Sequence, residues 1–201
     1  MPTNEQFQQL NQLITERKLF PGGYTLKLLD RKTAEQYVDT LTALVSQIPL
    51  VQYTQEEILA EKKSEGERIF YGKWEHSLVL FDQNKPIAVV IAYERKAERN
   101  SQYPQNTIYL SELAVDKKYQ GKGVARKILE IFFEMNRIVG LLYLDGETNF
   151  SVQTNFADWN AYVQDLYKSF GFVQRAEKVY PNRTDVVLGW TPTNKAVPVS
   201  D

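Results

Sequence analysis

The sequence of 201 residues contains no cysteine and a single histidine, His76. The missing cysteine excludes a disulfide scaffold, a thiolate nucleophile and a cysteine-ligated metal site. One histidine is too few for a histidine-rich metal centre, and a Ser-His-Asp triad would have to use His76. We therefore expect a site that needs no metal and no cysteine nucleophile.

Long apolar runs and an excess of charge of one sign are also absent. No stretch of about 18 apolar residues occurs, so we expect no transmembrane helix and no membrane partner. The first ten residues are polar and rich in glutamine, unlike a secretory signal, which favours a cytoplasmic protein. The 24 basic residues balance 25 acidic ones, which argues against nucleic acid as a partner.

What is present is an ordinary globular composition, with 43% hydrophobic and 24% charged residues. A chain of this length can bury a core without metal or disulfide support. The 12 tyrosines and 10 phenylalanines predict an aromatic-rich core. We predict one domain over residues 21–190, preceded by a helical extension at 1–20 and followed by a loose tail at 191–201.

The patterning predicts an α+β fold, a mixed α/β arrangement. Helical apolar spacing predicts helices over residues 3–18, 33–48 with Thr33 as N-cap, 55–65, 122–137 and 159–170. Short apolar runs bounded by turn residues predict strands over residues 24–29, 78–81, 87–93, 107–115, 141–144, 172–179 and 184–190. Residues 94–106 and 145–158 are predicted loops. The order strand–helix–strand over residues 107–144 implies a parallel pair, and the hairpins imply antiparallel strands.

The most informative segment follows the predicted strand 107–115, where Gln120-Gly121-Lys122-Gly123 leads directly into a helix. The first amides of a helix have no intrahelical partner, and glycine lets a backbone approach a ligand closely. The segment is therefore typical of a phosphate or pyrophosphate site, with positive charge nearby from Arg126. An ordinary glycine turn before a helix would contain the same residues.

Two other glycine motifs fit less well. A P-loop needs Ser or Thr after Gly121-Lys122, where Gly123 stands. A Rossmann fingerprint needs Gly or Ala at Arg126, and its glycines follow the strand without the intervening residues 116–120. Because Asp145 lies after the next predicted strand, where a ribose-binding acid would stand, dinucleotide binding stays open as a less favoured alternative.

The segment resembles motif A of the GNAT superfamily of acyl-CoA N-acyltransferases, Gln/Arg-x-x-Gly-x-Gly/Ala, through Gln120, Gly123 and Ala125. Family members often carry Asn, a Tyr seven residues later and then Gly-Phe. Here Asn160, Tyr167 and Gly171-Phe172 have that spacing. The resemblance covers residues 78–190. It implies a GNAT-like fold, in which a central, mostly antiparallel sheet contains a splayed parallel pair, expected here at residues 107–115 and 141–144.

The resemblance also implies acetyl-CoA as cosubstrate. The amides of residues 120–125 would hold the pyrophosphate, and the strand before them would pair with the pantetheine arm. The positions carried over for cofactor binding are Leu113, Ala114, Val115, Gln120, Gly121, Lys122, Gly123, Val124, Ala125, Arg126, Asn160 and Tyr167.

The implied reaction is direct transfer of an acetyl group to a primary amine of a small molecule or peptide. Tyr167 would protonate the departing thiolate, and Glu112 is the first candidate for the base. Asp145 and Glu147 are weaker candidates, and Tyr109 is a candidate substrate contact. The same residues also fit a core tyrosine and a surface carboxylate.

A GNAT-fold module that binds CoA without turnover is the alternative to an enzyme. The predicted loops 94–106 and 145–158 are expected to shape the acceptor pocket, because loops beside a cofactor site often carry specificity. A homodimer is compatible with the fold, although no sequence feature establishes one.

Overall fold

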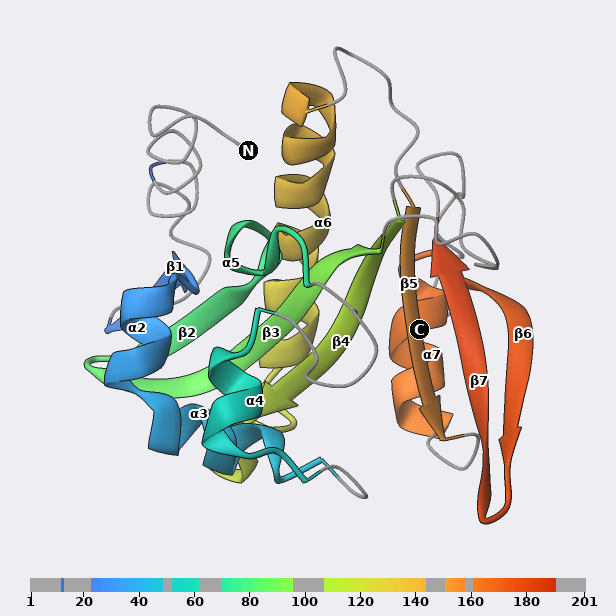
Figure 1. The fold of residues 1–201 in the computed structure, drawn as a ribbon, viewed down its shortest axis with the longest axis horizontal. Helices are drawn as coiled ribbons and strands as arrows, with labels where there is room; N and C mark the ends of the chain where they lie inside the picture. The colour runs from blue at the N-terminus through green and yellow to red at the C-terminus, as the bar shows by residue number, and fades with distance from the viewer. Residues whose placement is uncertain are drawn as a thin grey trace.

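The computed structural model describes Gln12 and residues 23–48, 52–61, 70–95, 107–143, 151–157 and 161–190. In this part of the chain seven strands form one sheet with the order β1-β2-β3-β4-β5-β7-β6 (Figure 1). The strands are β1 Tyr24–Leu28, β2 Leu78–Asp82, β3 Lys85–Arg95, β4 Thr107–Val115, β5 Ser151–Ala157, β6 Val173–Tyr180 and β7 Arg183–Trp190. All neighbouring strands are antiparallel except β4 and β5, which are parallel. The mixed, mostly antiparallel sheet flanked by helices confirms the predicted fold class.

The helices lie on both faces of the sheet. They are α2 Arg31–Gln36, α3 Val38–Val45, α4 Gln55–Leu59, α5 Lys73–His76, α6 Val124–Tyr143 and α7 Ala161–Ser169, with a 3-10 turn η1 at Lys117–Tyr119. Figure 1 shows α3 and α4 in front of β3 and β4, and α6 behind these strands. The sheet is therefore a central layer between two helical layers.

Two hydrophobic cores follow from this arrangement, one on each face of the sheet. Leu78 and Leu80 of β2 join the core under α6 and α7. The alternating residues Val79 and Phe81 join the core under α2, α3 and α4. A strand buried on both faces has a continuous apolar sequence rather than an alternating one, as the run from Leu78 to Phe81 has.

The sheet parts between its two parallel strands. β4 and β5 pair over three residues, Thr107 to Tyr109 with Ser151 to Gln153. Beyond Tyr109, β4 pairs in the described structure with β3, while β5 pairs with β7. Figure 1 shows the two strands diverging toward the end of β4 that leads into α6. The expected splayed pair is present, and it opens at the glycine segment.

The predicted partner of β4 is wrong. Residues 141–143, expected to be part of a strand, are the last turn of α6, which continues to Tyr143. The parallel partner is β5, which lies within residues 145–158 that were expected to form a loop. The apolar run at 141–144 is too short for periodicity to separate a buried strand from a helix, and Gly140 is tolerated inside α6 at a modest energetic cost.

The helices before the hairpin also differ from expectation. The predicted helix 33–48 is two helices, α2 and α3, separated at Tyr37. Its N-cap is Asp30, whose carboxylate accepts a 2.6 Å hydrogen bond from the Thr33 amide, so Thr33 is not the cap. α4 ends at Leu59 because Ala60 is extended, and α5 was not expected. The predicted helix 3–18, apart from Gln12, and the tail 191–201 lie outside the described residues.

Candidate active site

The glycine segment between β4 and α6 has the conformation that a close ligand approach requires. Gly121 and Gly123 have φ angles of +72° and +74°, in the left-handed region that favours glycine. No described atom lies within 4 Å of a Cβ built at either position, so both glycines border open space. The first helical hydrogen bond runs from the Lys127 amide to the Gly123 carbonyl at 3.1 Å. The amides of residues 124–126 therefore have no acceptor within the helix.

Side chains hold this segment in place before any ligand arrives. The Gln120 side-chain Nε2 donates to the Val115 carbonyl at 2.9 Å, and the Asp116 carboxylate accepts from the Lys118 backbone amide at 3.0 Å. The Tyr119 hydroxyl donates to Asp82 Oδ2 at 2.6 Å, which ties the segment to the β2–β3 hairpin. This hydrogen bond is the main reason that the pKa of Tyr119 is raised to about 12. The backbone amides are thus presented by a pre-organised loop.

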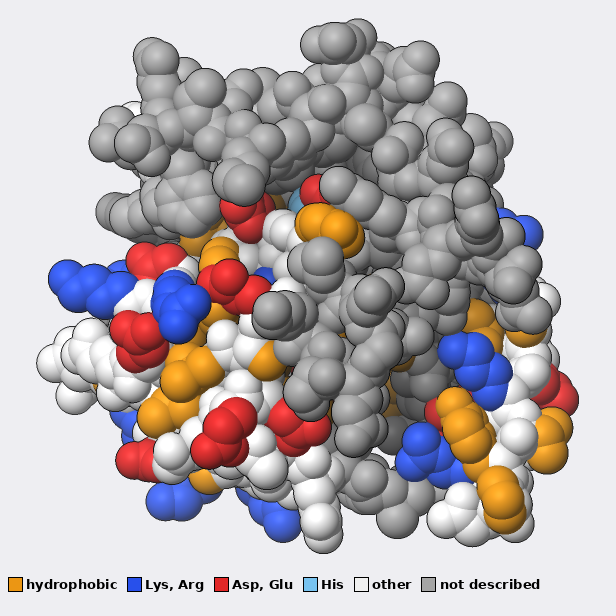
Figure 2. All heavy atoms as spheres, in the orientation of Figure 1, with side chains coloured by type: hydrophobic (Ala, Val, Ile, Leu, Met, Phe, Trp, Pro, Cys, Tyr) orange, Lys and Arg blue, Asp and Glu red, His pale blue; other side chains and the backbone are white. Residues whose placement is uncertain are grey.

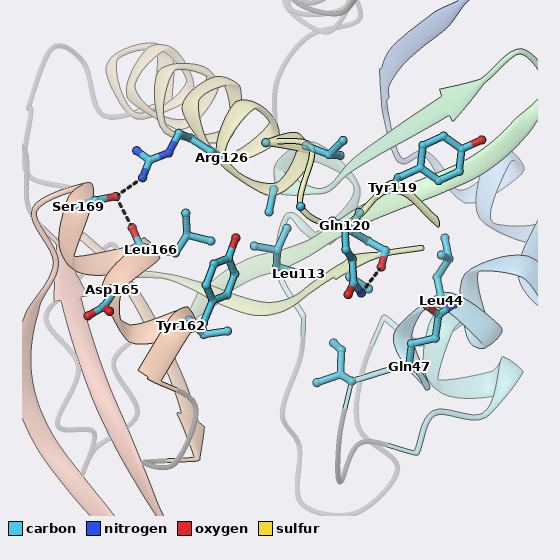
Figure 3. A pocket seen from close by; sticks show the side chains of 18 residues that line it. Leu44, Gln47, Leu113, Tyr119, Gln120, Arg126, Tyr162, Asp165, Leu166 and Ser169 are labelled. Carbon is cyan, nitrogen blue, oxygen red and sulfur yellow. Dashed lines mark hydrogen bonds between the residues drawn. The ribbon is translucent and has the colours of Figure 1, made fainter. Parts of the chain in front are cut away.

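A pocket of about 660 Å³ lies beside the segment (Figure 3), within the size range of ligand sites. Its walls come from the end of α3, the end of β4, the start of α6 and one side of α7. The described residues that line it are Leu44, Gln47, Ile48, Leu113, Ala114, Val115, Tyr119, Gln120, Gly121, Gly123, Val124, Ala125, Arg126, Tyr162, Val163, Asp165, Leu166 and Ser169.

Nine of the twelve predicted cofactor-binding residues line this one pocket. The nine are Leu113, Ala114, Val115, Gln120, Gly121, Gly123, Val124, Ala125 and Arg126. Of the remaining three, Lys122 places its ammonium 5.3 Å from the centre of the Tyr119 ring and is not in the described lining. Asn160 lies outside the described residues. Tyr167 is 3% exposed, and its ring packs 5.1 Å from that of Phe172 in the core under α6 and α7.

Glu112, the predicted base, lies on β4 one residue before the pocket-lining Leu113. The pairing register between β3 and β4 shifts between Ile91 and Ala92, which pair with Glu112 and Leu110. Ser111 has no paired residue on β3, so a bulge falls at Ser111. Bulges re-aim the side chains beside them and are common next to active sites. The Glu112 carboxylate accepts hydrogen bonds from Tyr53 at 3.0 Å and Ser111 at 3.2 Å. Burial raises the pKa of Glu112 to about 7, against a lowering by these two hydrogen bonds.

Comparison with models of known families identifies the family of this chain. Residues 73–174 match the family model described as acetyltransferase (GNAT) domain. The chain belongs to the GNAT acetyltransferase family. A search of curated proteins finds no match to the sequence.

Solved structures show that the whole GNAT fold is shared. The NatC complex bound to Gag peptide and CoA contains a chain with a TM-score of 0.61 and 21% identity, over 85% of this chain and 99% of that one. The Escherichia coli ribosomal-protein-S18-alanine N-acetyltransferase gives 0.58 and 14%, over 89% and 99%. The yncA protein from Salmonella typhimurium, solved with its cofactor acetyl-CoA, gives 0.59 and 15%, over 90% and 100%. At these identities the similarity establishes the fold.

Sequence reasoning missed the part of the GNAT pocket that α3 and α7 supply. Tyr162 is 72% exposed, and Figure 3 shows its ring directed into the pocket from α7. Leu166 and Ser169 follow at positions +4 and +7, so one side of α7 forms this wall. Sequence reasoning named Tyr167 of this helix as a site residue and none of these three. A polar serine in the row was the signal that this side faces a cavity.

A cationic side chain joins two walls of the pocket. Arg126 donates to Ser169 Oγ at 3.0 Å, and Ser169 in turn donates to the Leu166 carbonyl at 2.7 Å. The guanidinium also lies 5.4 Å from the centre of the Phe170 ring. The arrangement links α6 to α7 and places a positive charge beside the glycine segment (Figure 3).

The other residues singled out in the sequence lie elsewhere. Tyr109 contacts the Tyr93 ring at 5.5 Å between centroids. His76 is buried, with Nδ1 at 2.5 Å from Asn136 Oδ1 and Nε2 at 3.2 Å from Glu94 Oε1. Asp145 and Glu147 lie outside the described residues. Among the helices in the described ranges, none combines the length and apolar character needed to cross a membrane.

Proposed function

We propose that this GNAT protein transfers an acetyl group from acetyl-CoA to a primary amine by direct attack in a ternary complex. The observation that carries the proposal is the convergence of nine predicted cofactor-binding residues on one pocket, at the point where β4 and β5 diverge. The similar folds of NatC with CoA and of yncA with acetyl-CoA support the choice of cosubstrate.

The glycine segment supplies the phosphate site in this proposal. The free amides at the start of α6, which is 20 residues long, would bind the pyrophosphate, since a helix N-terminus carries partial positive charge. Arg126 adds a full positive charge at the same end of the pocket. The edge of β4 at Leu113 and Val115, beyond its pairing with β5, would hydrogen-bond the pantetheine arm.

The reaction needs a neutral amine and two proton transfers. The amine nitrogen attacks the thioester carbonyl, the N–C bond forms and the C–S bond then breaks. Glu112 takes the proton that the amine loses, directly or through a water, and a carboxylate with a pKa of about 7 suits this task near neutral pH. Tyr167 gives its proton to the CoA thiolate and is the proposed acid.

The acceptor is proposed to enter from the face of the sheet that carries Glu112 and α4, opposite α6. Exposed acidic residues lie on this face, and Figure 2 shows acidic side chains over α3 and α4. They include Asp39, Glu56 and Glu57. An acidic surface would attract an amine in its protonated resting form. NatC was solved with a Gag peptide, which supports a peptide amine beside a small-molecule amine as the acceptor class.

A CoA-binding module without turnover is the second candidate. It is favoured by one observation, the burial of Tyr167 outside the described pocket lining. Both candidates require the glycine segment to bind the pyrophosphate of CoA. They differ in whether acetyl groups leave CoA.

The test is a transfer assay with acetyl-CoA and a panel of small amines and peptides. Because the chain has no cysteine, a thiol reagent reports released CoA without a protein background. Mass spectrometry identifies the acetylated product. We expect transfer by the wild type and a rate lowered about 100-fold or more in Glu112→Gln, with acetyl-CoA affinity retained. Saturable acetyl-CoA binding with no product from any amine would favour the non-catalytic module.

A further inference from the structure

The Glu112 carboxylate is held by a residue 59 positions earlier in the chain. The Tyr53 hydroxyl donates to Glu112 Oε1 at 3.0 Å, and Ser111 donates to the same oxygen at 3.2 Å. Within the described residues, Glu112 Oε2 receives no hydrogen bond. One oxygen is therefore fixed by two donors, and the other has no hydrogen-bond partner in the part of the chain that the structure describes.

The segment that carries Tyr53 is anchored at both ends. Thr54 is the N-cap of α4 in a capping box: its hydroxyl accepts from the Glu57 amide at 3.2 Å, and Glu57 Oε2 accepts from the Thr54 amide at 2.9 Å. At the other end, the buried Lys73 ammonium donates to the carbonyls of Ile58 and Ala60, each at 2.7 Å. A five-residue helix is not stable alone, so these contacts fix where α4 lies. Tyr53 immediately precedes its N-cap and is fixed with it.

We propose that Tyr53 is a positioning residue, which holds Glu112 through Oε1 so that Oε2 faces the amine and accepts its proton. The inference rests on the proposed function, because it takes Glu112 as the base. Tyr53 keeps its own proton throughout, since burial and the nearby Glu112 carboxylate raise the pKa of the phenol far above its ordinary value. It therefore acts as a hydrogen-bond donor and not as a base.

The groups around Glu112 determine whether its pKa rises or falls when the Tyr53 hydroxyl is removed. Tyr53 and Ser111 lower the pKa of Glu112 by hydrogen bonding to its charged form, whereas Glu57 of α4 raises it by repulsion. Removing the Tyr53 hydroxyl takes away one of the two hydrogen bonds that counter the pKa increase caused by burial and Glu57. The pKa of Glu112 then rises further, and the base is protonated over a wider pH range.

The experiment measures kcat/KM against pH for the wild type, Tyr53→Phe, Glu112→Gln and the double variant, with one amine throughout so that its own ionisation is common to all. The acidic limb is the low-pH side of the kcat/KM profile, where Glu112 becomes protonated. We expect Tyr53→Phe to move this limb to higher pH by about one unit, so that kcat/KM at pH 6 falls roughly tenfold. In the presence of Glu112→Gln, the same change should alter the rate less than twofold. The matched control is Tyr37→Phe, whose ring packs on Phe81 in the same helical layer. It should leave the limb in place.

Two results would overturn the inference while the proposed function stands. One is an unchanged acidic limb in Tyr53→Phe with an active wild type. The other is an equal loss of rate with and without Glu112→Gln, which would mean that Tyr53 acts on the fold and not through Glu112. A wild type that acetylates no amine would instead remove the proposed function and the inference together. The phenylalanine keeps the ring, and thermal melts of all variants check that the fold is retained.

Discussion

Two tyrosines on α7 have opposite environments at the scale of single residues. Tyr167 is buried against Phe172, while Tyr162 lines the pocket. If Tyr167 is the acid, Tyr167→Phe should lower kcat by tenfold or more and change acetyl-CoA affinity less than twofold. Tyr162→Phe is the matched control and should keep kcat within twofold. Steady-state kinetics and calorimetry measure the two quantities. The reverse pattern would transfer the acid role to Tyr162.

Glu112 makes the stability of the protein depend on pH. Its pKa in the folded state, about 7, lies above the ordinary 4.5, so the folded state binds the proton more tightly than the unfolded one. The stability that this group contributes below about pH 4.5 is therefore lost as pH rises through 7. Glu112→Gln should raise the free energy of unfolding at pH 8 by about 3 kcal/mol relative to its effect at pH 4.5. Urea denaturation at the two pH values measures this, and an equal effect at both would contradict the assigned pKa.

The local sequence could predict the glycine segment and the neighbouring residues of the site. The nine predicted cofactor-binding residues that line the pocket all lie from Leu113 to Arg126, where one strand, one turn and one helix start follow each other. Tyr53 and Gln47 could not be predicted in the same way. Their contacts with Glu112 and Lys117 join positions 59 and 70 residues apart, and no periodicity encodes such a separation.

At the scale of elements, the glycine segment can be tested against a glycine of similar backbone geometry elsewhere. Gly123 and Gly23 have φ angles of +74° and +97°, so alanine at either position should cost about 1 kcal/mol of stability. Gly123→Ala should also weaken acetyl-CoA binding by about tenfold, because its methyl group enters the space beside the pocket. Gly23→Ala, before β1, should leave the affinity unchanged. Calorimetric titration of both variants is the measurement, and equal affinities would place the pyrophosphate elsewhere.

The elements around the parallel pair show where sequence patterns stop being decisive. β2, β3 and β4 were predicted because their apolar runs are bounded by clear turn residues. β5 was missed although Val152, Thr154 and Phe156 alternate with polar residues, a signal of a strand that Gln153 and Asn155 weaken. The neighbouring run at 141–144 has more apolar character and was taken as the strand, but it completes α6. The parallel pair joined by a helix was predicted correctly, and only the segment assigned to its second strand was wrong.

At the scale of the whole molecule, the sheet separates two environments that the proposed reaction brings together. The described pocket extends from the start of α6 and one side of α7 to the end of α3, and Glu112 and Tyr53 belong to the face that α3 and α4 cover. The gap between β4 and β5 joins the two faces, because the strands pair over three residues and then part. In this account the cofactor and the amine approach from opposite faces and meet at the gap.

The measurement that tests this account most directly is a calorimetric titration of the protein with acetyl-CoA, with NAD as the control ligand. We expect saturable binding of one acetyl-CoA and none of NAD. Acetyl-CoA at about 100 times its dissociation constant should add roughly 2.7 kcal/mol to the free energy of unfolding. Binding of NAD in place of acetyl-CoA, or binding of neither, would contradict the assignment of the glycine segment and the pocket beside it.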